Sequence, residues 1–255
     1  MRIEFFGNSD IGKKREFNED RFLCADLSRD HAGPPRPLYL FAVADGIGGH
    51  AGGEVASYLA METLKDDLTR RLDQAGADID LRQVLKDAFH QANREIFREG
   101  AGAERLAGMG TTLVAALITP GVATAANVGD SRLYLIRGDS MTRISQDHTW
   151  AAEQVRRKLL SEKEVVRSPF RNLVTRSLGY ASEIEVDSFQ VPLETGDWLL
   201  LCTDGLHGSL SDRLLRKFFR KGERAEDVCQ RLIAAAGKRG GQDNITAVVI
   251  SIREA

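Results

Sequence analysis

The stretch that decides the fold is residues 111–144, TTLVAALITPGVATAANVGDSRLYLIRGDSMTRI. It contains four short strand-like runs, separated by the turn dipeptides Pro120-Gly121, Gly129-Asp130 and Gly138-Asp139. Turn signals at such close spacing are typical of hairpins, so the stretch predicts an antiparallel meander.

The segments upstream of this stretch are of two other kinds. Residues 38–44, LYLFAVA, form a short continuous apolar run, as expected of a buried strand. Two amphipathic helices are expected after it, because apolar residues recur there at helical spacing. Their apolar faces consist of Val55, Leu59, Leu64, Leu68 and Leu72 in the first, and of Leu81, Leu85, Ala88, Ala92 and Ile96 in the second.

Downstream, helical and strand-like segments follow one another. Because the strands cluster apart from the helices, this order predicts an α+β fold and argues against a doubly wound α/β sheet. The expected elements are a mixed helical stretch at about 148–166, strands at about 184–191 and 197–202, helices at about 211–219 and 225–236, and a last strand at 245–252.

Composition excludes several classes of protein. The chain has 255 residues, 42% hydrophobic and 28% charged, with a net charge of −2. These values are typical of a globular protein and give no overall field that would recruit nucleic acid or an anionic membrane. No apolar run is long enough to span a bilayer. Cys24, Cys202 and Cys229 form no CxxC pair and are odd in number, which indicates reduced thiols and a cytoplasmic location.

Aspartates at the ends of strand-like runs are the sharpest chemical feature. Hard divalent cations such as Mg²⁺ or Mn²⁺ prefer oxygen ligands, and several carboxylates would repel one another without a cation. Each dipeptide taken singly is an ordinary turn, so the set predicts a metal centre only if its members meet in space. The members are Asn18-Glu19-Asp20, Ala44-Asp45-Gly46, Gly129-Asp130-Ser131, Thr203-Asp204-Gly205 and Gln242-Asp243-Asn244.

A glycine-rich segment, residues 45–54, allows a different interpretation. The spacing Gly46-x-Gly48-x-x-Ala51 matches the dinucleotide-binding fingerprint. Asp45 would set a carboxylate against the pyrophosphate, however, and the βα alternation of a dinucleotide-binding sheet is missing. A nucleotide P-loop also fails, because Glu54 stands where a lysine is needed. A dinucleotide-binding protein stays the weaker alternative.

An ordered series of motifs runs along the whole chain. The series is Gly12-x-x-Arg15-x-x-Asn18-Glu19-Asp20, Val43-Ala44-Asp45-Gly46-Ile47-Gly48-Gly49-His50, Gly110-Thr111-Thr112, Asn127-Val128-Gly129-Asp130-Ser131-Arg132, Gln146-Asp147-His148, Thr175-Arg176-Ser177-Leu178-Gly179, Leu201-Cys202-Thr203-Asp204-Gly205-Leu206 and Gln242-Asp243-Asn244-Ile245-Thr246. In order and spacing, the series resembles the metal-dependent PP2C-type (PPM) protein serine/threonine phosphatases, in their compact bacterial form. The match covers essentially the whole chain.

The resemblance implies a fold and an activity. It implies a single domain, residues 1–255, built as a four-layer α-β-β-α sandwich with two central antiparallel sheets flanked by helix pairs. It implies hydrolysis of phosphoserine and phosphothreonine in proteins by a metal-bridging water that attacks phosphorus in line, reversing a bacterial serine/threonine kinase. The expected partners are phosphorylated proteins, and we expect a cytoplasmic monomer.

The resemblance also implies a centre of two Mn²⁺ or Mg²⁺ ions. Asp45 would bridge both ions, with the carbonyl of Gly46 on one of them. Asp204 and Asp243 would hold the other ion, and Asp20 would act mainly through bound water. Two such ions would lower the pKa of a shared water and stabilise charge in the transition state.

Three further residues receive roles from the resemblance. Glu19 would act through water, and Asp130 would hold a third, weaker ion together with Asp204. Arg15 would grip the substrate phosphate, since a planar guanidinium suits bidentate phosphate binding. Without the resemblance, Arg15 is one more solvated arginine of the run Lys13-Lys14-Arg15.

One position departs from the family pattern. Animal members carry a histidine directly after the Asp-Gly pair, proposed as general acid, and here that position is Ile47. His50 follows three residues later, and the general acid stays open. We interpret the remaining histidines as structural; they are His31, His90, His148 and His207.

The segment at about 148–176, here called the flap, is rich in basic residues. We hypothesise that it selects phosphoproteins with acidic flanks, the alternative being a solvated helix face. The basic residues are Arg156, Arg157, Lys158, Lys163, Arg167, Arg171 and Arg176.

A catalytically dead, phosphoprotein-binding member is the other alternative to the enzyme, and the loss of a core aspartate would favour it.

Overall fold

Two five-stranded antiparallel sheets form the centre of the molecule. The computed structural model describes residues 1–28, 37–48, 50–74 and 79–254. The first sheet has the order β1 (Arg2–Asp10), β12 (Ile245–Arg253), β11 (Trp198–Cys202), β8 (Arg132–Arg137) and β9 (Ser140–Arg143). The second has the order β10 (Asp187–Pro192), β7 (Val122–Val128), β6 (Leu113–Thr119), β3 (Tyr39–Ala44) and β2 (Arg21–Asp26).

The predicted meander over 111–144 is wrong. Its strands form two hairpins, β6–β7 and β8–β9, and each hairpin belongs to a different sheet. Gly129-Asp130 therefore carries the chain from one sheet to the other instead of closing a hairpin. A short ladder of β4 (Gly46–Ile47) with β5 (Gly110–Thr111) lies beside the second sheet.

The sheets pack face to face, and burial on both faces explains the unbroken apolar run at 38–44. Phe41 and Val43 point between the sheets, where they pack with Leu199 and Val248 of the first sheet. The alternate residues of the same strand belong to a second core beneath the helices, with Leu40 among them.

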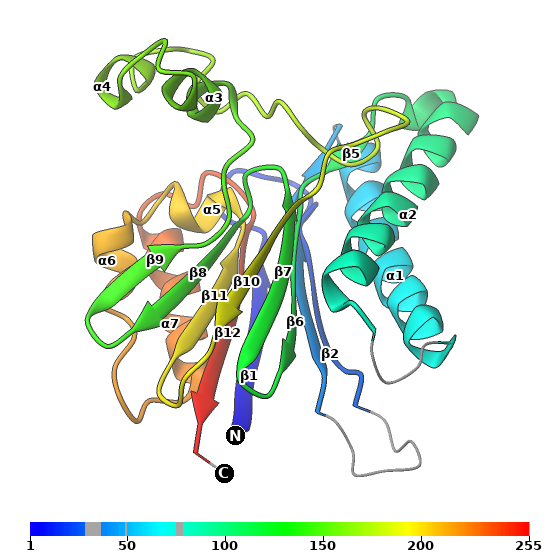
Figure 1. Cartoon of the computed structure of the whole chain (residues 1–255). Helices are drawn as coiled ribbons and strands as arrows, with labels where there is room; N and C mark the ends of the chain where they lie inside the picture. Colours follow the sequence, from blue (N-terminus) through cyan, green and yellow to red (C-terminus); the bar gives the residue numbers. More distant parts are fainter. Residues whose placement is uncertain (29–36, 49, 75–78, 255) are drawn as a thin grey trace.

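Helices cover the outer face of each sheet (Figure 1). The two predicted amphipathic helices are present as α1 (His50–Gln74) and α2 (Leu81–Gly102), followed by η1 (Glu104–Leu106), and they pack on the second sheet. The first sheet is covered by α7 (Ala225–Lys238) and by two short helices. These are α5 (Asp204–His207) and α6 (Asp212–Arg216), of which α6 is shorter than the predicted 211–219. The four-layer α-β-β-α arrangement is thus confirmed.

The flap extends beyond this sandwich. It contains α3 (Trp150–Arg156) and α4 (Glu162–Val165), which stand above one end of the sheets in Figure 1. A β-bridge between Thr149 and Val174 draws its two ends together. Within the described part of the chain, no helix combines the length and apolarity needed to cross a bilayer.

The structure also tests smaller predictions. The three cysteines are free, with Cys202 and Cys229 buried. Every pair among the named strands is antiparallel, so the glycine-rich segment does not belong to the parallel βαβ unit that dinucleotide binding needs. His31 and the side chain of His50 lie outside the described residues.

Candidate metal and phosphate site

The predicted acidic residues meet at one edge of the sandwich. Asp45, Asp130 and Asp204 each follow the carboxyl end of a strand, namely β3, β7 and β11. Asp20 and Asp243 each precede the start of a strand, β2 and β12. Because β2 is antiparallel to β3, Asp20 lies at the same edge as Asp45, and because β12 is antiparallel to β11, Asp243 lies at the same edge as Asp204.

A cavity of about 230 Å³ opens between these strand ends. Asp20 does not line it and lies behind the other acidic groups, only 1% exposed. Thr112 and two flap residues, Asn172 and Val174, also line the cavity, and sequence reasoning gave none of them a role. The predicted site residues on its wall are Arg15, Glu19, Asp45, Gly46, Asp130, Asp204 and Asp243.

The electrostatics of the site show that these carboxylates face one another. Burial raises the pKa of Asp45 well above its usual range, and the nearby negative charges of Asp20 and Asp204 raise it further. Burial likewise raises the pKa of Asp20 and that of Asp130 to about 7, each reinforced by Asp204. The pKa of Asp204 is raised by burial and then by Asp243. A bound cation would offset the repulsion between these negative charges.

Two oxygens of the cluster have no hydrogen-bond partner. They are Oδ1 of Asp20 and Oδ1 of Asp204, both buried, and such atoms cost about 1–3 kcal/mol each. Hard divalent ions supply what a buried carboxylate oxygen lacks, so the donor set fits Mn²⁺ or Mg²⁺. Among the residues that the structure describes, no three His, Cys, Asp or Glu side chains already have the spacing of a complete coordination shell. The fit therefore rests on the donor atoms and their charge.

Backbone hydrogen bonds fix the position of Asp45. Its N–H donates to Oγ1 of Thr112 over 3.0 Å, and its carbonyl accepts from the N–H of Thr112 over 2.9 Å. Thr112 in turn shares a 2.7 Å hydrogen bond with the hydroxyl of Ser131. The threonine motif thus ties the strand end that bears Asp45 to the turn that bears Asp130.

Gly46 occupies a place where no side chain fits. A Cβ there would lie 2.2 Å from the carbonyl oxygen of Gly53 and 2.8 Å from that of Glu19. The Glu19 backbone N–H donates to Oδ1 of Asn244 over 2.9 Å. Nδ2 of Asn244 donates to the carbonyls of Ile11 and Phe17. Asn244 thereby holds the loop that carries Arg15 and Glu19, a role that sequence reasoning missed.

Arg15 lies at the mouth of the cavity. Its guanidinium donates to Oδ2 of Asp243 over 2.8 Å, and the two side chains are 49% and 32% exposed. An exposed pair of this kind adds little stability. It leaves the remaining guanidinium donors free to face an anion that enters the cavity.

Two histidines hold the turn at Asp130. Nδ1 of His148 accepts from the N–H of Gly129 over 3.0 Å, and Nε2 of His207 lies 3.0 Å from the Asp130 carbonyl. Burial lowers the pKa of His148 and lowers that of His207 to about 3, so both rings are neutral near pH 7. The interpretation of these two histidines as structural agrees with their backbone contacts. Ile47 lines the cavity and offers no proton there.

The metal-free protein is expected to lose stability as the pH rises from 7 to 8.5. The folded-state pKa of Asp20 and of Asp130 is about 7, against about 4 in the unfolded chain. At pH 7 the folded state therefore still binds more protons than the unfolded chain, and its stability falls as the rising pH removes them. The melting temperature in EDTA should be about 2–4 °C lower at pH 8.5 than at pH 7. Excess Mn²⁺ should raise both values and shrink the difference.

Thermal unfolding followed by circular dichroism measures this effect. The comparison stays above pH 7 because the buried neutral histidines change the free energy of unfolding with pH in the opposite direction. Their contribution appears only below about pH 6.5. A metal-free protein that melts at the same or a higher temperature at pH 8.5 would contradict the expectation.

Comparisons with known proteins identify the family of this chain. The family model described as "Protein phosphatase 2C" matches residues 12–248. The chain is 34% identical over 250 residues to "Serine/threonine phosphatase stp" of Listeria innocua, covering 98% of this chain and 95% of that protein. The structure of the Streptococcus agalactiae serine/threonine phosphatase superposes with a TM-score of 0.87 at 31% identity, over 99% of this chain and 100% of that one.

A further similar structure contains metal ions. It is the catalytic domain of the phosphatase PstP, solved in complex with two manganese ions. It has a TM-score of 0.81 and 32% identity to this chain, and 99% of each chain is covered. With a family model that spans nearly its whole length, the chain belongs to the protein phosphatase 2C family.

Proposed function

We propose that this chain hydrolyses phosphoserine and phosphothreonine in proteins at the cavity lined by Asp45, Asp204 and Asp243, with two Mn²⁺ or Mg²⁺ ions. The observation that carries the proposal is the cluster of mutually repelling carboxylates, two of them with orphaned oxygens, beside an arginine at the cavity mouth. The similar phosphatases support the reaction class, and the manganese complex of PstP supports the ions.

The acidic residues would hold the ions in distinct ways. Asp45 would face both ions, assisted by the Gly46 carbonyl, while Asp204 and Asp243 would hold one of them. When bound, the ions supply activation of a water molecule for in-line attack on phosphorus and neutralisation of charge on the phosphoryl oxygens. Asp20 and Glu19 would act through bound water, and Asp130 would hold a third, weaker ion together with Asp204.

The protein's own groups orient the substrate. Arg15 would bind two phosphoryl oxygens, and Asp243 holds its guanidinium in place for this. Thr112 is the one hydroxyl side chain on the cavity wall among the described residues, and it is engaged by Asp45 and Ser131. We therefore assign no covalent phospho-enzyme. The oxygen of a water molecule joins phosphorus and gives up one proton to solvent as the ester bond breaks, and the leaving serine or threonine oxygen takes a proton from solvent.

The setting of this activity is also proposed. A bacterial serine/threonine kinase would supply the phosphorylated proteins that the chain acts on. Three free cysteines fit a reducing compartment, and we place the enzyme in the cytoplasm as a monomer.

The proposal is tested by hydrolysis of a phosphothreonine peptide. Phosphate release should require Mn²⁺ or Mg²⁺, stop on addition of EDTA and return when excess Mn²⁺ is added. A folded protein that binds the peptide but releases no phosphate with any divalent ion would favour the catalytically dead alternative. Nucleotide analysis of the purified protein tests the dinucleotide-binding alternative, which predicts a dinucleotide that is retained during purification.

The basic flap is expected to affect phosphopeptides more than small substrates. Arg156 lines a larger cavity of about 720 Å³ that shares Asp130 and Asp204 with the smaller one, whereas its neighbour Arg157 does not line it. Arg156→Glu should therefore lower kcat/KM for a phosphopeptide with acidic flanks about fivefold, as a charge at a binding rim does. Turnover of a small aryl phosphate should be unchanged.

Arg157→Glu is the matched control, since it makes the same charge change one residue away. It should leave both substrates nearly unaffected. Equal losses on the phosphopeptide and the aryl phosphate would refute selection by the flap.

A further inference from the structure

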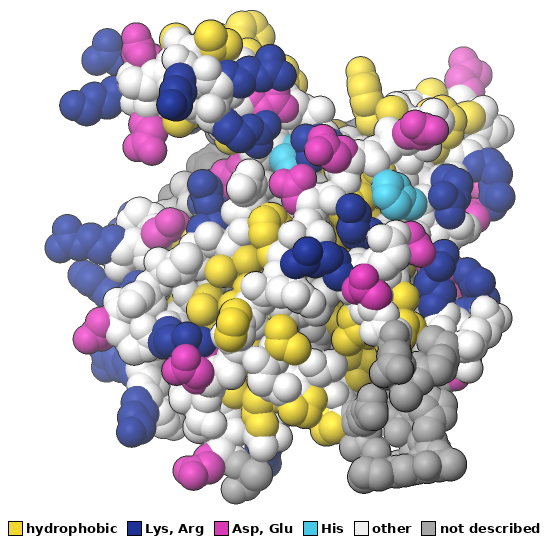
Figure 2. Space-filling view, viewed as in Figure 1, with side chains coloured by type: hydrophobic (Ala, Val, Ile, Leu, Met, Phe, Trp, Pro, Cys, Tyr) yellow, Lys and Arg dark blue, Asp and Glu magenta, His cyan; other side chains and the backbone are white. Residues whose placement is uncertain are grey.

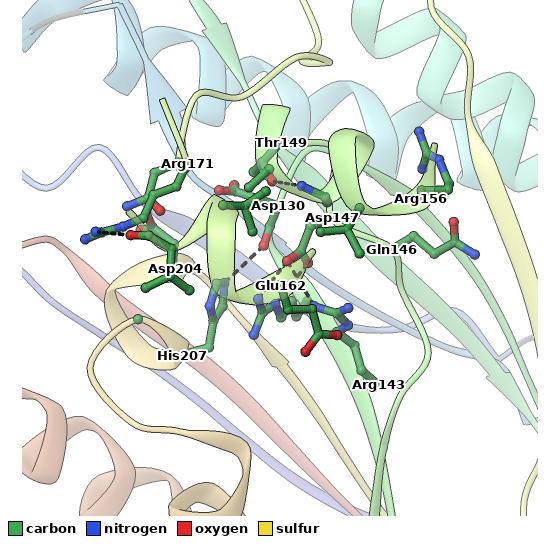
Figure 3. A pocket seen from close by; sticks show the side chains of 18 residues that line it. Asp130, Arg143, Gln146, Asp147, Thr149, Arg156, Glu162, Arg171, Asp204 and His207 are labelled. Carbon is green, nitrogen blue, oxygen red and sulfur yellow. Dashed lines mark hydrogen bonds and ion pairs between the residues drawn. The ribbon is translucent and has the colours of Figure 1, made fainter. Parts of the chain in front are cut away.

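His207 connects two parts of the acidic cluster that come from different sheets. It is the last residue of α5, and Asp204 is the first residue of the same short helix. Its Nε2 lies 3.0 Å from the backbone carbonyl oxygen of Asp130. A carbonyl can only accept, so Nε2 carries the proton and donates it. Figure 3 shows the ring directed from α5 toward Asp130, with this hydrogen bond drawn between them.

The turn that His207 contacts is already under constraint. Gly129 has φ +105°, and a Cβ there would lie 2.6 Å from the side chain of Thr112. The side-chain amide of Asn127 donates to the carbonyl of Gly129, and Nδ1 of His148 accepts from the Gly129 N–H. The next carbonyl belongs to Asp130, a residue only 7% exposed, and it accepts a hydrogen bond from His207.

The charged groups near the His207 ring pair with one another. Arg132 binds Asp147 through two hydrogen bonds, of 2.9 Å and 2.6 Å, and Arg143 adds a third to the same carboxylate over 3.0 Å. Because Arg132, Arg143 and Asp147 pair with one another, none of them competes with the Asp130 carbonyl for His207. With His207 they line the larger cavity, where space-filling atoms show the gap beneath the flap (Figure 2).

We propose that His207 is a positioning residue that sets the separation between the carboxylates of Asp130 and Asp204. A short helix and one hydrogen bond then fix two side chains from different sheets, so that both can contact one divalent ion. The inference rests on the proposed metal-dependent function. It concerns the affinity of the Asp130–Asp204 pair for the ion, and it leaves the role of Asp45 as described.

Two neutral variants of similar polarity test the hydrogen bond. His207→Gln can place an amide N–H near the position of Nε2, whereas His207→Asn is one methylene shorter and cannot reach the carbonyl. Mn²⁺ binding to the metal-free protein is measured by titration calorimetry, and the Mn²⁺ dependence of aryl phosphate hydrolysis is measured in parallel. Loss of a group that orients a ligand typically costs 10- to 100-fold in metal affinity.

The expected result is a split between the variants. His207→Asn should raise the half-saturating Mn²⁺ concentration of the weakest binding step about tenfold, as Asp130→Asn should. His207→Gln should stay within about twofold of the wild type. KM for the aryl phosphate at saturating Mn²⁺ should be unchanged in both variants.

Other results would overturn the inference. Lower melting temperatures with unchanged Mn²⁺ binding would show a merely structural role. A well-folded His207→Gln protein with tenfold weaker binding would exclude the hydrogen bond as the cause, even if His207→Asn fails to fold. Wild-type protein that neither binds Mn²⁺ nor hydrolyses phosphate would overturn the proposed function as well, whereas an active wild type with an unaltered His207→Asn overturns this inference by itself.

Discussion

Asp45→Asn is expected to lower kcat for a phosphothreonine peptide by about 10³-fold or more. Asparagine keeps the size of the side chain but removes a charge that would face both ions, and stabilisation by such ions is worth several kcal/mol in the transition state. The fold should survive, because Thr112 holds the residue through its backbone. Initial rates at saturating Mn²⁺ measure the effect.

The same substitution should make the metal-free protein more stable. It removes one of several buried charges that raise each other's pKa, so the melting temperature in EDTA should rise while activity is lost. Asp66→Asn is the matched control, since Asp66 is exposed on α1 and does not line the cavity. It should leave both activity and melting temperature near the wild-type values. Asp45→Asn activity within tenfold of the wild type would contradict the role of Asp45.

Arg15→Ala is expected to lower kcat/KM about 10²-fold. The guanidinium would donate two charge-assisted hydrogen bonds to the phosphoryl group, and hydrogen bonds to charged groups are worth about 1.5–3 kcal/mol each. Stability should change little, because the Arg15–Asp243 pair is exposed. Steady-state kinetics on the phosphothreonine peptide measure the loss.

Two companion variants identify the cause of that loss. Arg15→Lys keeps the charge but not the planar fork, so it should recover only part of the activity. Lys14→Ala removes an exposed positive charge one residue away and should stay within about twofold of the wild type. If Arg15→Ala and Lys14→Ala have equal effects, Arg15 acts only through the general charge of the loop.

Local patterns in the sequence predicted most of the secondary structure. The run at 38–44 became β3 because a strand buried on both faces must be apolar at every position, and its residues divide between two cores. The helix patterns became α1 and α2 because each helix has one apolar face, and that face packs against the second sheet. β1 was missed because it lies at the edge of its sheet, half-buried and with polar residues at its end.

The candidate site could be named from the sequence but not assembled from it. The motif series supplied Asp45, Asp204, Asp243 and Arg15, and the structure brings all four to one cavity. Spacing along the chain contains no information on which strand ends share an edge. That depends on strand pairing between residues distant in the sequence, such as Cys202 with Ala247 and Arg132, or Asp10 with Ile245.

Within this protein, the sequence by itself determined the α+β class, the amphipathic helices and the set of acidic residues, because each follows from local spacing and residue chemistry. Only the tertiary structure decided that Gly129-Asp130 passes between two sheets and that His207 meets Asp130. The Gly-Asp dipeptide favours a turn in either case, so its local preference does not decide between closing a hairpin and joining two sheets. The choice is made by which apolar faces the following strand can bury, and those faces come from the whole chain.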